Sequence, residues 1–250
     1  MSRIDLFKKD LEAKKAVKII AGIDNFDVHR VKNVLIAAEK CGASAVDIAA
    51  DADLIQMAKD VTTLPIFVSS TSPEMLLMAK NEGADALEIG NFDALYKKGV
   101  RISAKDVVDM TAKTRELVGE GIFLSVTIPG HISVEEQVEL ARELEDMNVN
   151  LIQSEGASVA NVNNDGARGM LEKVNVSIAN TMEIINATSI PVMTASGITP
   201  ATAAMPFAAG ASAIGVGSCV NKLNSSLEMI ATVMNIMEKV DLKREEKIHA

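Results

Sequence analysis

The phrases CGASAVDI (41–48), EGADALEI (82–89) and AGASAIGV (209–216) repeat one pattern within a chain of 250 residues. Each phrase ends a segment of helical periodicity at a glycine, continues through an alanine, and then begins a short apolar run. Glycine commonly ends a helix that leads into a strand. The recurrence of this joint therefore predicts a chain built from repeated β-strand and α-helix units.

Apolar or β-branched runs with the length of buried strands recur along the chain, and a segment with helical periodicity follows each. We expect strands over residues 17–22, 44–50, 65–70, 85–90, 122–128, 150–156, 191–197 and 212–217. The helices that follow them are expected over residues 28–39, 53–59, 73–81, 104–118, 134–147, 177–186, 200–209 and 225–240. Eight such units in a chain of this length predict a (β/α)₈ TIM barrel rather than a doubly wound sheet.

The whole chain, residues 1–250, is expected to form a single domain, because no linker rich in Pro, Gly or Ser divides it. An additional N-terminal helix over residues 4–15 is expected to close the amino-terminal end of the barrel. The connections at 91–103 and 157–175 are longer than usual strand-to-helix loops. Because barrel enzymes place their chemistry on this face, we expect both connections to act as lids.

Charge and composition restrict the classes of partner. The chain carries 34 acidic and 25 basic residues, a formal net charge of −9, and only 3% aromatic residues. These values argue against nucleic acid or an anionic membrane surface as a partner. The longest apolar runs fall well short of the roughly 20 residues of a spanning helix, and Cys41 and Cys219 form no disulfide or zinc pattern. We therefore expect a cytoplasmic protein with reduced cysteines.

Glycine-rich turns accompany the ends of the last two expected strands. SGIT (196–199) ends strand seven, and GVGS (215–218) ends strand eight. In TIM barrels the loops at these two places commonly present backbone N–H groups to a phosphate, and glycine lets the anion approach the backbone. The sequence therefore predicts a phosphate site made by Ser196, Gly197, Gly215, Gly217 and Ser218. The alternative is that these glycines only allow tight turns.

Carboxylates interrupt two of the apolar strands. Asp47 and Glu88 lie within runs that are otherwise apolar, where an unpaired carboxylate would be costly. We expect both side chains to point into the barrel and to serve as general acid and base. Substrate is expected to be oriented by Asn91, His131 and Glu155. The rest of the barrel mouth is expected to be formed by Asp24, Asn25, Asp27, Thr127 and Gln153, although the first and third of these also suit helix caps.

Metal and cofactor chemistry stays open from the sequence. Carboxylates gathered at one mouth suit Mg²⁺, and the predicted phosphate site also suits flavin mononucleotide (FMN). A Schiff-base mechanism is disfavoured, because Lys18 is expected at the amino-terminal end of the first strand and the other expected strands contain no lysine. Cys219 is expected to be a small buried side chain rather than a nucleophile.

Seven phrases occur in order along the chain: GIDNFD (22–27), GASAVDIAA (42–50), EIGNFDALYKKG (88–99), VTIPGH (126–131), NLIQSEG (150–156), VMTASGIT (192–199) and IGVGS (214–218). Together they resemble the uncharacterised "hypothetical chloroplast reading frame twenty-three" family of algal plastids and cyanobacteria. The resemblance spans nearly the whole chain and implies an aldolase-type TIM barrel, while it leaves the reaction open. The matching polar and glycine positions include all the catalytic and mouth residues named above except Asp24, together with Phe26, Asp93, Ser196, Gly197, Gly217 and Ser218.

Two classes of function follow from these observations. The first is an enzyme, of the lyase, isomerase or synthase type, that acts on a small phosphorylated metabolite held by the glycine loops. The second is a barrel without catalysis that senses a ligand or takes part in an assembly. We favour the enzyme, because this face of TIM barrels so often carries chemistry. Methionine-rich stretches at 75–78 and 229–237 suit either helix packing or subunit contacts in a homo-oligomer.

Overall fold

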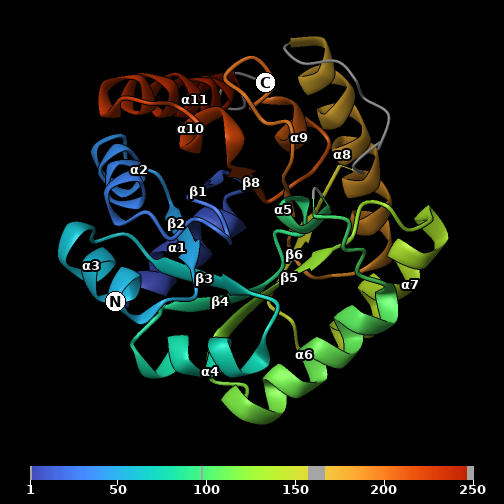
Figure 1. Ribbon diagram of the computed structural model, residues 1–250. Helices are drawn as coiled ribbons and strands as arrows, with labels where there is room; N and C mark the ends of the chain where they lie inside the picture. The colour runs from blue at the N-terminus through green and yellow to red at the C-terminus, as the bar shows by residue number, and fades with distance from the viewer. Residues whose placement is uncertain (1, 97, 157–166, 247–250) are drawn as a thin grey trace.

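The computed structural model describes residues 2–96, 98–156 and 167–246, and in it eight parallel strands close into a barrel. Each strand pairs with the next one along the chain, and β8 pairs with β1 (Figure 1). The strands are β1 (Ala16–Ile20), β2 (Ala45–Ala49), β3 (Ile66–Ser70), β4 (Ala86–Ile89), β5 (Phe123–Ile128), β6 (Leu151–Ser154), β7 (Val192–Thr194) and β8 (Ala213–Val216). This closed parallel barrel confirms the predicted (β/α)₈ fold.

Helices surround the barrel and connect its strands. They are α1 (Arg3–Glu12), α2 (Val28–Lys40), α3 (Ala52–Val61), α4 (Pro73–Asn81), α5 (Asp93–Tyr96), α6 (Ala104–Val118), α7 (Val134–Asp146), α8 (Ala167–Ala187), α9 (Met205–Ala208), α10 (Ser218–Asn221) and α11 (Ser226–Glu246). Several begin where a side chain caps the first turn, as Ser133 does by accepting from the backbone N–H of Glu136. No helix within the described ranges combines the length and the apolar character that a membrane span requires.

The side chains of each strand alternate between the barrel interior and the layer beneath the helices. Outward-facing residues such as Val17, Ile19 and Val46 join the helices in the main apolar core. The inward-facing residues nearest the amino-terminal end form a separate apolar cluster, which we call the apolar plug. Its strand residues are Ala16, Ala45, Phe67, Ala86, Phe123, Leu151, Met193 and Ala213.

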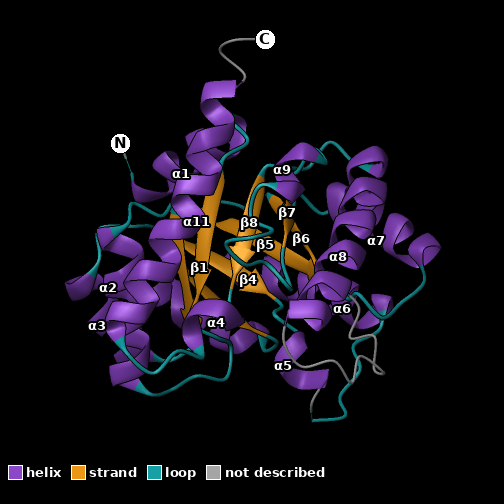
Figure 2. Ribbon diagram, turned by 90° about the horizontal axis from the view of Figure 1, so that it is seen from above, coloured by secondary structure: helices purple, strands orange, loops and turns teal. Residues whose placement is uncertain are grey.

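The N-terminal helix α1 completes the apolar plug, as the sequence predicts. Phe7 is fully buried, and its ring centroid lies 4.9 Å from that of Phe67 and 6.0 Å from that of Phe123. Leu11 joins the same cluster. Figure 2 shows α1 and α5 at opposite ends of the barrel. One end of the barrel is therefore closed by apolar packing, and chemistry is confined to the other end.

Helix α8 begins at Ala167, ten residues before the expected start at 177, so the predicted lid at 157–175 is shorter than expected. The part of that lid at 157–166 lies outside the described residues. The missed segment, residues 167–176, contains Gly169 and Asn175, and both residue types have low helix propensity. In the structure Thr181 is buried and bonds both to Ser154 at 2.6 Å and to Thr194 at 2.7 Å.

The helix expected over 200–209 is reduced to α9, which begins at Met205. Pro206 explains the difference, since proline lacks the backbone N–H that a helix interior requires but is tolerated in the first turn. The long connection after β4, in contrast, contains the short helix α5. These differences change the loops at the barrel mouth and leave the barrel itself unaffected.

Truncating Phe7 tests the apolar plug. We expect Phe7→Ala to lower the free energy of unfolding by about 3–5 kcal/mol, because it leaves a cavity between two other aromatic rings. Leu6→Ala is the matched control, since Leu6 is 51% exposed on the same helix, and it should change stability by less than about 0.5 kcal/mol. Urea unfolding measures both variants, and equal effects would contradict the assigned closure.

Candidate active site in the barrel mouth

The barrel interior becomes polar immediately beyond the apolar plug. The inward-facing positions of six consecutive strands carry polar or charged side chains, each at most 1% exposed. Register places Glu88 beside Ser69 on one side and Ser125 on the other. We call this set the polar layer, and its members are Lys18, Asp47, Ser69, Glu88, Ser125 and Gln153.

The structure corrects the expectation for Lys18. This residue is the third of five in β1, its side chain is completely buried in the barrel, and its ammonium donates to Glu88. The same ammonium lies 3.7 Å from Oδ2 of Asp47 and 5.0 Å from the ring centroid of Phe67. Because side chains alternate along β1, Lys18 points into the barrel, and its long flexible side chain carries the ammonium to the barrel centre. From the sequence we had expected this residue to lie away from the site.

One ammonium therefore faces two carboxylates where water is excluded. Burial raises the pKa of Asp47, the charge of Lys18 lowers it, and the charge of Glu88 raises it again. Hydrogen bonds from Ser69 and Asn91 lower the same pKa, and the balance is a value of about 6. A carboxyl that exchanges its proton near neutral pH is suited to general acid–base chemistry.

Asn91 connects the loop after β4 to the polar layer. Its amide nitrogen donates to Oδ2 of Asp47 at 2.7 Å and to Oγ of Ser69 at 2.9 Å. Its amide oxygen accepts from Nε2 of Gln153 at 2.9 Å, and its backbone N–H donates to Oγ1 of Thr127 at 3.2 Å. The backbone of Asn91 is left-handed, with φ of 62°, which asparagine tolerates better than most residues. Three other predicted site residues, Asp47, Thr127 and Gln153, thus bond to Asn91.

Gly90 makes this close approach geometrically feasible. Its φ is 151°, and a Cβ at this position would overlap the side chain of Thr127. The sequence-based analysis did not select Gly90, Ser69 or Lys18 as site residues. Alternation places Ser69 on the same face of β3 as Phe67 and Lys18 on the same face of β1 as Ala16, but only barrel closure shows that these faces are interior.

Glu155 and His131 belong to a second group, which is linked through Tyr96. The Tyr96 hydroxyl donates to Oε2 of Glu155 at 3.0 Å, and the His131 ring meets the Tyr96 ring edge-on at 5.1 Å between centroids. Burial and the nearby charge of Arg101 lower the pKa of His131, whereas Glu136 raises it. The structure therefore brings two of the predicted orienting residues together, through a tyrosine that the sequence-based analysis did not select.

The two glycine loops lie at the mouth with distinctive backbone conformations. Ser196 and Gly197 follow β7 with φ of 67° and 78°, and both are partly exposed. Gly217 immediately precedes α10, and Ser218, its first residue, is exposed. The left-handed backbone of Gly197 and the absence of a side chain at Gly197 and Gly217 let a ligand approach the backbone here.

Gly215 serves a different purpose from the one that the sequence suggested. It lies inside β8 and is buried, beside Lys18 in the strand register. A Cβ at Gly215 would lie 3.1–3.2 Å from atoms of Ile20, Ala195 and Gln153. The position therefore requires glycine for packing of the barrel interior rather than for access to a loop.

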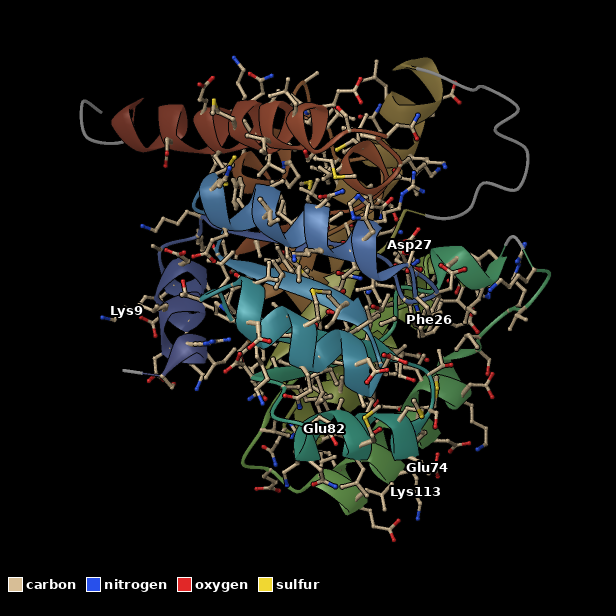
Figure 3. The ribbon with its side chains drawn as sticks, turned by 60° about the vertical axis from the view of Figure 1, so that its left-hand side comes forward. Lys9, Phe26, Asp27, Glu74, Glu82 and Lys113 are labelled. Atoms are coloured by element: carbon tan, nitrogen blue, oxygen red, sulfur yellow. The ribbon has the colours of Figure 1, made fainter. Side chains whose placement is uncertain are left out.

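The loop after β1 uses its polar residues largely for its own structure. The Asn25 side chain donates to the backbone carbonyl of Ala21, just after β1, at 3.0 Å, and Asp27 caps α2 by accepting from the backbone N–H of Arg30 at 3.1 Å. Asp24 forms an exposed ion pair with Lys98 at 3.1 Å. Figure 3 shows Phe26 and Asp27 at the beginning of α2, where Phe26 is 57% exposed. The helix-cap alternative thus holds for Asp27.

A Mg²⁺ site on Asp47 and Glu88 does not fit the structure. The ammonium of Lys18 already contacts both carboxylates and occupies the position between them that a metal ion would need. Across the described ranges no group of three or more His, Cys, Asp or Glu side chains is arranged to hold a metal ion. The two carboxylates of the polar layer are therefore paired with a side chain, which offsets one of their two charges.

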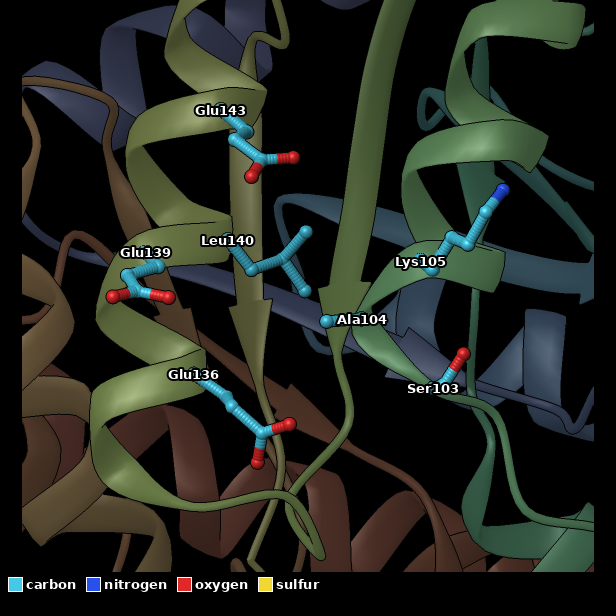
Figure 4. Close-up of a pocket in the computed structure, with 7 residues that line it drawn as sticks. All are labelled: Ser103, Ala104, Lys105, Glu136, Glu139, Leu140 and Glu143. Atoms are coloured by element: carbon cyan, nitrogen blue, oxygen red, sulfur yellow. The ribbon is translucent and has the colours of Figure 1, made fainter.

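A surface cleft lies outside the barrel, between α6 and α7 (Figure 4). Its volume is about 330 Å³, and its lining includes three glutamates from α7 and Lys105 from α6. The described lining residues are Ser103, Ala104, Lys105, Glu136, Glu139, Leu140 and Glu143. None of them belongs to the polar layer or to the glycine loops, so this cleft is separate from the candidate active site.

The closed parallel barrel defines the fold class as a TIM barrel of the aldolase type. Among solved structures, 3-hexulose-6-phosphate synthase is similar, with a TM-score of 0.65 and 13% identity over 90% of this chain and 99% of that chain. (S)-3-O-geranylgeranylglyceryl phosphate synthase from Thermoplasma acidophilum, in complex with sn-glycerol-1-phosphate, gives a TM-score of 0.64 and 17% identity over 96% and 98%. At these identities the likeness shows the fold alone.

Within this class, the chain belongs to the family described as "Protein of unknown function (DUF561)", whose model matches residues 2–246. The "Uncharacterized protein ycf23" of Cyanophora paradoxa is 40% identical over 241 residues, which cover 96% of this chain and 97% of the relative. The protein of the same description from Pyropia yezoensis is 34% identical over 94% of this chain and 86% of the relative. The resemblance to the reading-frame-twenty-three family is therefore confirmed.

The raised pKa of Asp47 predicts a pH dependence of stability. The folded protein keeps the Asp47 proton up to about pH 6, whereas the unfolded chain releases it near the ordinary value of 3.8. Because the folded state binds more protons between these values, the free energy of unfolding falls as pH rises through them, by about 3 kcal/mol at most. Above that window this contribution is absent.

Urea unfolding of wild type and Asp47→Asn at several pH values measures this effect. We expect the stability of wild type to decline relative to that of the variant up to about pH 6 and then to run parallel with it. Curves that run parallel through the whole range would show that Asp47 titrates at its ordinary value.

Proposed function

We propose that this protein is an enzyme acting on a small phosphorylated metabolite, with chemistry of the lyase, isomerase or synthase type. The observation that carries the proposal is the protonatable Asp47, which is held by Asn91 and Ser69 and balanced by Lys18 inside an otherwise closed barrel. A purely structural site would gain little from a buried carboxyl that is short of positive charge. Such a group is more useful in proton transfer.

The glycine loops after β7 and β8 are the proposed phosphate site. Ser196, Gly197, Gly217 and Ser218 supply backbone N–H groups at the mouth, with a left-handed backbone at the first two. Solved structures of similar fold are named for phosphorylated compounds, including 3-hexulose-6-phosphate synthase and thiamine phosphate pyrophosphorylase. These names support the substrate class by analogy of fold.

Asp47 is the proposed general acid and base. The Asn91 side chain donates to Oδ2 of Asp47 and accepts from Gln153. The two amide side chains together therefore hold the Asp47 carboxyl in one orientation. Glu88 is the second proposed acid–base group: one of its oxygens accepts from Lys18, while Oε1 is buried without a hydrogen-bond partner in the described part of the chain. His131 and Glu155 are proposed to orient the substrate.

We also propose a cytoplasmic location. Cys41 and Cys219 are both free, as thiols are in a reducing compartment. Burial raises the pKa of Cys219 to about 12, so its thiol is a poor nucleophile at neutral pH.

Gly217→Asp tests the phosphate site. A Cβ at Gly217 would make only ordinary contacts, at 3.7 Å to Asn221 and 3.9 Å to Ile20, so the variant should fold. We expect native mass spectrometry to detect a phosphorylated species on wild type and none on the variant, because the new carboxylate repels the anion. Gly121→Asp is the matched control, because it adds the same charge just before β5, at the opposite end of the barrel, where a Cβ meets open space.

Added ligand gives a second readout. At a hundredfold excess over Kd, a bound phosphorylated compound should raise the melting temperature of wild type and of the control by about 5–10 °C. No bound species on wild type and no response to phosphorylated compounds would overturn the proposed substrate class. A bound FMN would instead select the flavin alternative.

Asp47→Asn tests the chemistry. The amide preserves the shape of the side chain and one acceptor oxygen but cannot exchange a proton, so turnover of the ligand identified by mass spectrometry should fall by about 10²–10⁴-fold while binding persists. Asp60→Asn, on the exposed surface of α3, is the matched control and should retain turnover. A folded Asp47→Asn protein with full turnover would refute the role of Asp47, and the ligand-sensing alternative would gain if wild type binds but does not convert the ligand.

A further inference from the structure

Arg101 is a cation near the mouth that has no acidic partner among the described residues. Its guanidinium lies 5.1 Å from the ring centroid of Tyr96, and Nη1 donates to the backbone carbonyls of Tyr96 at 3.2 Å and Val100 at 3.3 Å. None of the ion pairs formed by the described residues includes Arg101. In a chain with a net charge of −9, acidic partners are plentiful, so an arginine that is held by ring stacking and carbonyls has its remaining N–H groups open to a ligand.

His131 lies beside the same tyrosine. Its ring meets Tyr96 edge-on at an interplanar angle of 80°, and its Nδ1 is buried without a hydrogen-bond partner in the part of the chain that the structure describes. Arg101 lowers the pKa of His131, which places the two groups within electrostatic reach of each other. The negative charge of Glu136, in contrast, raises the pKa of His131. A positive charge facing an imidazole with an unsatisfied nitrogen disfavours the imidazolium until an anion arrives.

Tyr96 holds this pair in place. Its hydroxyl donates to Glu155 at 3.0 Å, so the ring that carries Arg101 on its face and His131 at its side is anchored to the end of β6. A stacked guanidinium is preorganised, because less side-chain entropy is lost when it binds a planar anion.

We infer that Arg101 and His131 form a second anion site, which binds a carboxylate or phosphate group at the end of the substrate away from the glycine loops. Arg101 follows β4 and His131 follows β5, whereas the glycine loops follow β7 and β8, so the closed strand order places the two sites on opposite sides of the mouth. The substrate is then a small molecule with two anionic ends that spans the polar layer. This assignment of substrate class rests on the proposed phosphate site.

Inorganic phosphate, titrated at constant ionic strength, tests the second site through the His131 imidazole signal in NMR spectra. We expect phosphate to raise the pKa of His131, because a bound anion favours the imidazolium. Arg101→Gln should weaken this response at least about tenfold, the loss expected for one charge-assisted hydrogen bond. Arg142→Gln is the matched control, because it removes one exposed guanidinium from α7 and should leave the response unchanged.

The backbone amide signals of Gly217 and Ser218 report the glycine loops in the same titration. A response there that Gly217→Asp abolishes, with no change at His131, would overturn the second site and leave the phosphate site standing. A response at His131 that depends on Arg101, with silent loops, would support the second site and overturn the phosphate site. Equal His131 responses in wild type and Arg101→Gln would also overturn the second site.

Discussion

The contact of the Lys18 ammonium with Asp47 and Glu88 is the interaction on which the barrel interior depends. Three charged groups lie at the centre of the structure with essentially no exposed surface. Transfer of each from water is unfavourable, and only their mutual attraction and hydrogen bonds offset that penalty. Breaking such a pair by removing one partner typically destabilises a protein by about 3–5 kcal/mol. The same arrangement that stabilises the interior leaves one carboxyl in excess, and that excess supplies a proton near neutral pH.

The apolar plug and the polar layer divide the barrel along its axis. Aromatic and aliphatic side chains, capped by Phe7 from α1, fill the amino-terminal half. Charged and amide side chains fill the next positions of the same strands, and Asn91 connects them to the loops. Water and ligand therefore approach from one end only. This polarity explains why every candidate functional residue lies on the carboxyl-terminal half of the barrel, as the fold requires.

Two features of the mouth differ in how they are built. The polar layer is held by strands, so its geometry follows from the barrel register and is rigid. The groups around Tyr96 and around Ser196 are held by loops and by short helices, where the backbone adopts left-handed conformations. Such segments tolerate changes of sequence more readily than strands do. The proposed acid–base chemistry therefore depends on the barrel, and the proposed recognition of a substrate depends on the loops.

The fold was predictable from sequence because its evidence is local. Eight apolar runs with helical segments between them and three copies of one glycine joint are visible along the chain, and the buried positions of Asp47 and Glu88 follow from the same runs. The roles of Lys18 and Gly215 were not predictable in this way. Which side of a strand faces the interior depends on barrel closure and register, and these are set by contacts between residues that are distant in sequence.

The composition of the site was likewise a matter of tertiary structure. Sequence indicated polar residues at strand ends, but a network requires that loops and strands from β2 to β6 meet at one point, as they do around Asn91. The start of α8 and the pairing of Tyr96 with Glu155 also depend on packing partners elsewhere in the chain. Sequence by itself therefore determined the repeating unit, the barrel and the two buried carboxylates. Tertiary structure decided which cation neutralises them and which side chains surround the mouth, because those choices depend on distances across the barrel rather than along the chain.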